Sequence, residues 1–102
     1  MFETSWIKQK IELSNYSFTR HGDQERKNDN LSISEIEEAL LSSQIIEQYS
    51  DTGRGKSCLA VGFTHKGKPI HIVCGEMDND LVIITVYIPV PPKFKNPYQR
   101  ER

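Results

Sequence analysis

The second half of the chain alternates apolar with other side chains at a period of two, and this pattern constrains the fold more than any other feature. It predicts four strands, over residues 44–49, 58–64, 69–75 and 81–88. The loop at residues 65–68 contains a glycine and is short enough for a β-hairpin. Residues 76–80 form the next turn, and Pro89 ends the last strand. The strands that these turns join are predicted to be antiparallel.

The first part of the chain has a helical pattern instead. Three helices are predicted: a short amphipathic one over residues 4–13, a polar one over residues 19–28, and one with an apolar stripe that starts after Ser32. Thr19 is a suitable N-cap for the second helix. Ser32 and Glu35 have the spacing of a capping box, and Leu31 and Ile36 that of a hydrophobic staple. The fold class that follows is α+β, with two or three N-terminal helices packed on one face of a four-stranded antiparallel sheet.

The composition narrows the class of protein. The chain has 102 residues, of which 36% are hydrophobic, and this is enough for one core. We expect a single α+β domain over residues 1–92 and a basic, flexible tail over residues 93–102. No apolar run is long enough to span a membrane, and the start lacks the pattern of a signal peptide. Cys58 and Cys74 are therefore expected to be reduced, buried thiols of a cytoplasmic protein.

The charges are segregated although the net charge is only −1. From Gly53 to Gly75 there are four basic residues and no acidic one, and residues 93–102 add four basic residues against one acid. A local basic surface can bind phosphate even when the net charge is near zero. A solvated surface of mixed charge is the alternative interpretation.

Strand alternation divides the side chains between two faces of the sheet. One face is predicted to be apolar and covered by helices, and it carries Leu59, Val61, Phe63, Ile70, Ile72, Cys74, Val82, Ile84, Val86 and Ile88. The open face is predicted to carry Ala60, Gly62, Thr64, His71, Val73, Ile83, Thr85 and Tyr87. On that face we expect His71 opposite Thr85 and Gly62, with Tyr87 one step further. A histidine, an aromatic ring and nearby lysines suit single-stranded RNA, whose bases stack and whose phosphates need cations.

A zinc site is not expected. Cys74 and His71 fall on opposite predicted faces, and the chain has no C-x-x-C or H-x-x-x-H pair. We therefore predict neither a metal nor another cofactor.

Several short motifs resemble a widespread, uncharacterised bacterial domain family. They are the run Phe18-Thr19-Arg20-His21-Gly22-Asp23-Gln24-Glu25-Arg26, the helix start Leu31-Ser32-Ile33-Ser34-Glu35, Gly62, the strand Gly67-Lys68-Pro69-Ile70-His71-Ile72-Val73, and the strand Ile84-Thr85-Val86-Tyr87-Ile88-Pro89. The family is similar to the small bacterial ribonuclease toxins related to RelE and BrnT. This resemblance implies helices on a four-stranded antiparallel sheet, cleavage of messenger RNA, and a protein antitoxin that occupies the site. The catalytic lysine and arginine positions of RelE-like proteins have no one-to-one match here.

RNA cleavage by attack of a 2′-hydroxyl needs a general base, a general acid and groups that bind the phosphate. The candidate catalytic residues are His71, His21, Arg26 and Tyr87, and the candidate substrate-binding residues are Arg20, Arg54, Lys56, Lys68 and Thr85. The two histidines are assigned to proton transfer. Arg26 and Arg20 are assigned to the phosphate, because a guanidinium engages two phosphate oxygens at once. Tyr87 is assigned to stacking on a base or to donating a hydrogen bond.

Each assignment has a structural alternative. His21 can form an ion pair with Glu25 one turn along the helix, and His71 can be a strand residue bonded to Thr85. Arginines on a polar helix are usually solvated, and Tyr87 can be a half-buried packing residue. A second class of function therefore stays open, a non-enzymatic module that binds a nucleic acid or a protein partner through the same face.

Overall fold

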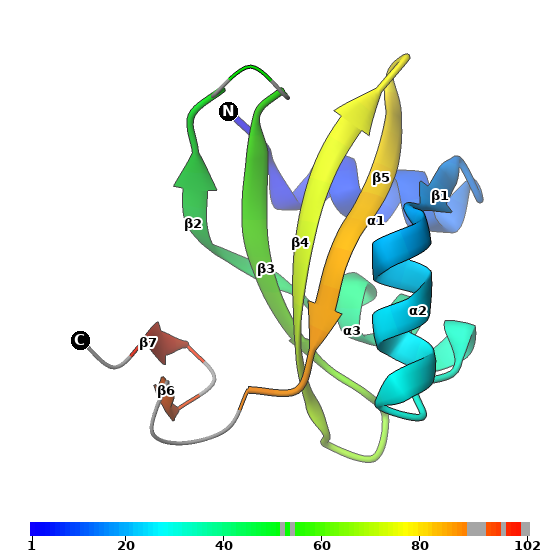
Figure 1. Cartoon of the computed structure of the whole chain (residues 1–102), viewed down its shortest axis with the longest axis vertical. Helices are drawn as coiled ribbons and strands as arrows, with labels where there is room; N and C mark the ends of the chain where they lie inside the picture. The colour runs from blue at the N-terminus through cyan, green and yellow to red at the C-terminus, as the bar shows by residue number, and fades with distance from the viewer. Residues whose placement is uncertain (52, 54, 90–93, 97, 101–102) are drawn as a thin grey trace.

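The predicted strands and helices form in the expected order, with one strand added at one edge of the sheet and two short strands added near the end of the chain (Figure 1). A computed structural model describes residues 1–51, 53, 55–89, 94–96 and 98–100. The elements are α1 (Thr4–Glu12), β1 (Tyr16–Phe18), α2 (Arg20–Asn28), α3 (Ile33–Leu41), β2 (Gln44–Tyr49), β3 (Ser57–Phe63), β4 (Pro69–Met77), β5 (Asp80–Tyr87), β6 (Phe94–Asn96) and β7 (Gln99–Arg100). The α+β class is confirmed.

The main sheet is five-stranded and mixed, so the expected four-stranded antiparallel sheet is wrong in its strand number and in one strand direction. The strand order is β1-β5-β4-β3-β2, with β1 parallel to β5 and the other neighbours antiparallel. β1 pairs Tyr16 with Leu81 and Phe18 with Ile83. β1 has only three residues, which is too short for an alternating pattern to be recognised in the sequence. Its partner β5 also lies far along the chain. β6 and β7 form a separate two-stranded sheet within the predicted tail.

The capping signals of the helices are confirmed. Thr19 is the N-cap of α2, and its hydroxyl accepts a hydrogen bond from the Gly22 backbone N–H at 3.0 Å. Ser32 and Glu35 form both hydrogen bonds of the capping box at the start of α3. These signals are local, which is why the sequence is sufficient to predict them.

The core lies between α1, α3 and the rear face of the sheet in the view of Figure 1. It contains Ile7, Ile11, Leu31, Ile36, Ala39, Leu40, Cys58, Ala60, Ile70, Ile72, Cys74, Leu81, Ile83 and Val86. Tyr16 connects β1 to α3, because its hydroxyl donates to Glu37 at 2.6 Å. Burial, followed by the hydrogen bond and charge of Glu37, raises the pKa of Tyr16 to about 12.

The assignment of faces is wrong for β3. Ala60 belongs to the core, and Gly62 lies directly beneath α3, where an added Cβ would be 1.7 Å from the Ala39 carbonyl oxygen. Leu59 and Val61 are buried on the opposite face. Both faces of β3 are therefore buried, and on the helix side small residues are needed because α3 approaches so closely.

The faces are also wrong in the first half of β5, and the reason is a β-bulge. Val73 pairs with Thr85 and Cys74 pairs with Ile83, so Ile84 is an extra residue in β5. A bulge of this kind reverses side-chain alternation on one side of it. Leu81 and Ile83 consequently face the helices. The predicted rear positions of Ile70, Ile72, Cys74 and Val86 are confirmed.

The two cysteines are free and fully buried, as predicted. Cys58 and Cys74 are directly opposite each other on β3 and β4, on the helix-covered face. Contact with the Cys58 thiol, together with burial, raises the pKa of Cys74 well above its usual range. The raised pKa keeps Cys74 in its unreactive thiol form at neutral pH, and both cysteines are inaccessible to solvent.

Helix α2 covers the edge of β5 beyond the end of β1. The Thr19 hydroxyl donates to the Ile84 carbonyl at 3.0 Å, and the Val86 N–H donates to Glu25 Oε1 at 2.9 Å. Gly22 is buried, and a Cβ there would be 2.7 Å from the Ile83 carbonyl oxygen. Thr19 and Glu25 thus form hydrogen bonds with backbone groups of β5 that would otherwise bond to a neighbouring strand.

The Gly22→Ala variant is expected to be less stable than the wild type by about 2 kcal/mol. In an ordinary helix this change stabilises by about 1 kcal/mol, so the sign is reversed here. The methyl group would push α2 away from the β5 backbone. Urea unfolding followed by circular dichroism measures the difference, with Gln24→Ala on the exposed side of α2 as control. An increase in stability for Gly22→Ala would contradict the close packing of α2 on β5.

Candidate functional site

His71 and Tyr87 form the centre of the candidate site. They are directly opposite each other on β4 and β5, where His71 Nδ1 lies 3.3 Å from the Tyr87 hydroxyl. Their ring centroids are 5.2 Å apart, and the rings are tilted by 51°. His71 is 0% exposed, whereas Tyr87 is half-buried. A titratable imidazole is thus in contact with a phenol that reaches the surface.

The predicted neighbours of His71 change because of the register. Its partners are Tyr87 on β5 and Val61 on β3, rather than Thr85 and Gly62. Thr85 lies opposite Val73, on the same face as Tyr87 and two residues before it. The structure therefore brings three of the predicted site residues onto one face, with Tyr87 in the place expected for Thr85.

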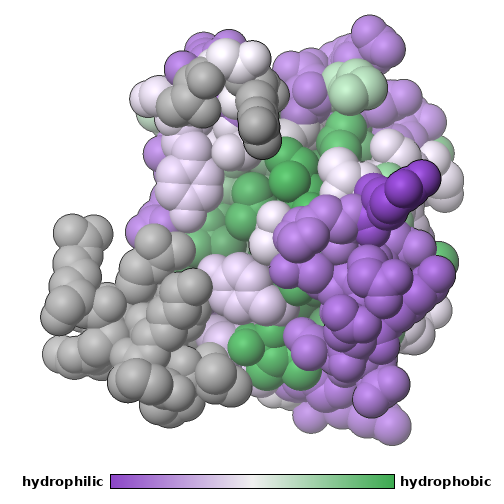
Figure 2. Space-filling view, in the orientation of Figure 1, coloured by the Kyte–Doolittle hydropathy of each residue, from purple (hydrophilic) through white to green (hydrophobic). Residues whose placement is uncertain are grey.

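We call the side of the sheet away from α1 and α3 the uncovered face because neither helix lies on it, and it faces the viewer in Figure 1. Val61 and His71 on this face are nevertheless almost fully inaccessible to solvent. Its central side chains are those of Val61, Phe63, His71, Val73, Thr85 and Tyr87. Phe63 also contacts Tyr98, with ring centroids 5.9 Å apart. Figure 2 shows hydrophobic side chains in the middle of this face and hydrophilic ones on the side of α2. The face is more apolar than the sequence predicts, because Val61 and Phe63 lie on it instead of on the predicted helix-covered face.

His21 does not share a strand pair with His71. It is exposed near the start of α2, where its Nε2 lies 3.2 Å from a carboxylate oxygen of Glu25. The other oxygen of Glu25 accepts from the backbone of Val86 at the outer edge of β5. The backbone of β5 thus lies between the two histidines. The sequence indicates this ion pair of His21 with Glu25 as the structural alternative to a catalytic role.

Arg26 is held by contacts with α2, with β1 and with the segment before α3. Its Nε donates to Asp23 at 2.9 Å, another nitrogen donates to the Leu31 carbonyl at 3.2 Å, and the guanidinium lies 5.6 Å from the Phe18 ring centroid. Hydrogen bonds and charges from Lys27 and Arg26 hold the pKa of Asp23 below its usual range. Arg26 therefore joins α2 to the start of α3, and Arg20 is exposed at the first turn of α2.

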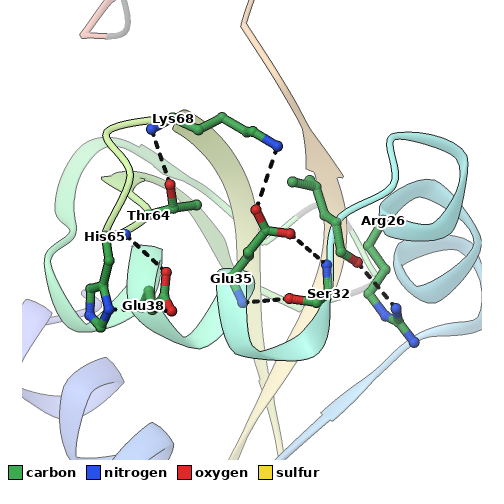
Figure 3. A network of polar contacts seen from close by, with 8 residues as sticks. Arg26, Ser32, Glu35, Glu38, Thr64, His65 and Lys68 are labelled. Atoms are coloured by element: carbon green, nitrogen blue, oxygen red, sulfur yellow. Dashed lines mark hydrogen bonds and ion pairs between the residues drawn. The ribbon is translucent and has the colours of Figure 1, made fainter.

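The hairpin between β3 and β4 is attached to α3 (Figure 3). Lys68 Nζ lies 3.5 Å from a Glu35 oxygen, and His65 contacts Glu38 through both its backbone N–H and its ring. The Ser32 N–H, followed by Lys68, lowers the pKa of Glu35. The Lys68 side chain thus extends toward the helix layer rather than over the uncovered face.

The remaining predicted cations lie elsewhere. Lys56 is exposed just before β3, and Ser57 next to it pairs with Gly75. Its backbone is therefore separated from Val61, the partner of His71, by five residues, or roughly 17 Å along the strand. Arg54 lies outside the described residues. The described cations that were predicted to bind the substrate are therefore not assembled around His71.

Within the described ranges, no three His, Cys, Asp or Glu residues gather as metal ligands would. The described helices are likewise too short or too polar to cross a membrane. What the described site can do chemically is transfer a proton between His71 and Tyr87 and contact an apolar or aromatic surface.

The fold and site define an α+β domain with a histidine–tyrosine pair on an uncovered sheet face. A family model, described as a domain of unknown function (DUF4258), matches residues 18–88. The chain belongs to this family, and the match runs from β1 through β5. No curated protein and no solved structure matches the chain.

Proposed function

We propose that this domain is a metal-independent ribonuclease of the toxin–antitoxin type, and that its substrate binds across the uncovered face. The observation that carries the proposal is the contact of 3.3 Å between His71 Nδ1 and the Tyr87 hydroxyl. The resemblance of the family to RelE-like and BrnT-like toxins favours RNA as the substrate and a protein antitoxin as the partner.

In the proposed reaction Tyr87 touches the substrate and His71 acts through it. The Tyr87 oxygen takes the proton of an RNA 2′-hydroxyl while its own proton passes to His71 Nδ1. This assignment requires the neutral tautomer of His71 with its proton on Nε2. The 2′-oxygen then forms a bond to phosphorus and the bond from phosphorus to the 5′-oxygen breaks. The leaving oxygen takes a proton from water, and the hydroxide so formed takes back the proton that His71 holds, through Tyr87. The products are a 2′,3′-cyclic phosphate and a 5′-hydroxyl.

The rest of the face suits a nucleotide base. Phe63 and Tyr87 are aromatic side chains on the same face, and base stacking on such rings contributes about 1–3 kcal/mol per base. Thr85 adds a hydroxyl beside them, two residues from Tyr87. The requirement for a 2′-hydroxyl makes the reaction specific for RNA over DNA.

The first test is cleavage of a mixed-sequence, single-stranded RNA by the purified protein in EDTA. We expect fragments that end in 2′,3′-cyclic phosphates, and no cleavage of a DNA of the same sequence. The same RNA with 2′-O-methyl groups should stay intact. If the unmodified RNA also stays intact, with or without added Mg²⁺, the enzymatic proposal fails.

A second candidate function is a binding module that uses the same face for a protein partner. The burial of His71 and the engagement of Arg26 and Lys68 in contacts with other residues favour it. Apolar side chains in the middle of an uncovered face are typical of protein interfaces. Intact RNA together with saturable binding of a protein at Phe63 and Tyr87 would support this alternative.

A further inference from the structure

A cleft of about 460 Å³ lies at the far end of the sheet from His71. Its lining includes Phe2 and Trp6 on the α1 side, Asp51 and Lys56 on the β2–β3 connection, Glu76 of β4, and Glu3. Glu76 is five residues beyond His71 along β4. The cleft is therefore separate from the proposed RNA site.

Two aromatic rings form the apolar part of the cleft. The centroids of Phe2 and Trp6 are 5.8 Å apart, with the rings tilted by 55°. The Phe2 backbone is held by Gln48, whose side-chain amide accepts from its N–H at 3.2 Å and donates to its carbonyl at 2.9 Å. Lys10 Nζ lies 5.7 Å from the Trp6 centroid, so this ring already accepts one cation.

The charges of the described lining residues are predominantly negative. Among the side chains, three carboxylates, those of Glu3, Asp51 and Glu76, are present with one cation, Lys56, and Met1 with its amino group also lines the cleft. The backbone N–H groups of Gly53 and Gly55 lower the pKa of Asp51. An aromatic cleft with this charge is complementary to a cation and not to a phosphate.

The cleft continues as a second hollow of about 250 Å³ toward the sheet edge. The two hollows share Phe2 and Lys56, and the second is also lined by Gln48, Tyr49 and Ser50 at the end of β2. β2 is the last strand of the sheet on that side. Together the two hollows thus run from Trp6 to the end of β2, which gives room for an extended polypeptide.

We propose that this cleft binds an arginine side chain of an extended polypeptide partner. A planar guanidinium can stack on Trp6 and donate to two carboxylates at once, which a lysine ammonium does less well. The flanking residues of the partner would lie along the second hollow beside β2. The inference does not depend on the proposed ribonuclease activity.

Trp6 is the single tryptophan of the chain, so its fluorescence reports on this cleft directly. The probe is a blocked pentapeptide with one arginine between glycines and serines. Its matched control contains citrulline, which has the same shape without the charge. We expect saturable quenching of Trp6 by the arginine peptide, with an affinity at least about tenfold higher than for the citrulline peptide.

Two charge variants give opposite expected effects. Glu76→Gln should weaken binding of the arginine peptide by about threefold to tenfold, because it removes one attractive carboxylate. Lys56→Met should strengthen binding, because it removes a repelling side-chain cation from the lining. Glu12→Gln, an exposed position at the other end of α1, is the control and should leave the affinity unchanged. Glu76 is also exposed, so its variant should fold normally, and circular dichroism checks this.

Three results would overturn the proposal. They are equal affinities for the arginine and citrulline peptides, a loss of affinity in Lys56→Met, and an unchanged affinity in Glu76→Gln. Blocked free arginine tests the source of the guanidinium. If it binds as tightly as the peptide, the cleft is a site for a small organic cation and the polypeptide partner is excluded.

Discussion

The Gly62→Ala variant is expected to lose about 3 kcal/mol or more of its free energy of unfolding, more than the other glycine variants considered. The added Cβ would lie 1.7 Å from the Ala39 carbonyl oxygen and 2.5 Å from its carbonyl carbon. Both atoms belong to the backbone of α3, so no side-chain rotation relieves the clash. The free energy of unfolding of a domain is only about 5–15 kcal/mol, and the variant should therefore lose a large part of its stability at 37 °C.

Gly75→Ala is the matched control for this prediction. Gly75 is also a buried strand glycine, but its Cβ would clash with the end of the Ile84 side chain alone, at 2.9 Å, and the nearest backbone atom would be 3.6 Å away. That side chain can move, so we expect a loss of less than about 1.5 kcal/mol. Urea denaturation of both variants gives the comparison. Equal losses would show that α3 does not approach β3 as closely as the structure indicates.

The Tyr87→Phe variant is expected to cleave RNA at least about 100-fold more slowly than the wild type, while it binds RNA with similar affinity. The change removes only the hydroxyl that contacts His71, and it keeps the ring that would stack on a base. His71→Asn should show a similar loss, because a side-chain amide can bond to Tyr87 but cannot take its proton. The measurement is the single-turnover rate of cleavage in EDTA.

Tyr16→Phe is the control for this pair. It removes another part-buried tyrosine hydrogen bond, the one to Glu37, at a site on β1. We expect it to lower stability by about 1 kcal/mol and to leave the cleavage rate unchanged. A dependence of the wild-type rate on pH that disappears in His71→Asn would identify the imidazole as the titrating group. Full activity in Tyr87→Phe would exclude the proposed proton transfer.

Local signals in the sequence predict most of the secondary structure. The N-cap at Thr19 and the capping box at Ser32 depend on residues at most three apart. The strands over residues 44–49 and 69–75 follow from alternation alone. The residues that define such features are close together in the sequence, so their spacing is enough to predict them.

The face assignments fail where the physical cause is distant in the sequence. The bulge at Ile84 depends on how β5 meets β4, and the exchange of faces in β3 depends on the approach of α3 to Gly62. For the site, the sequence correctly places His71 and Tyr87 on one face. It cannot show that Lys68 extends to Glu35, a residue 33 positions earlier. The sequence does contain a pattern that predicts burial of both faces of β3, since all four residues of Cys58–Val61 are apolar.

The position of α2 also limits how copies of this chain can assemble. At one end of the sheet β1 has three residues, and α2 satisfies the edge of β5 beyond it. Among the described strands, β2 is thus the one long edge available to another molecule. Two copies joined through β2 would form a closed pair with two-fold symmetry and leave no second long edge for growth. Association through the sheet would therefore stop at a dimer rather than continue into a fibre.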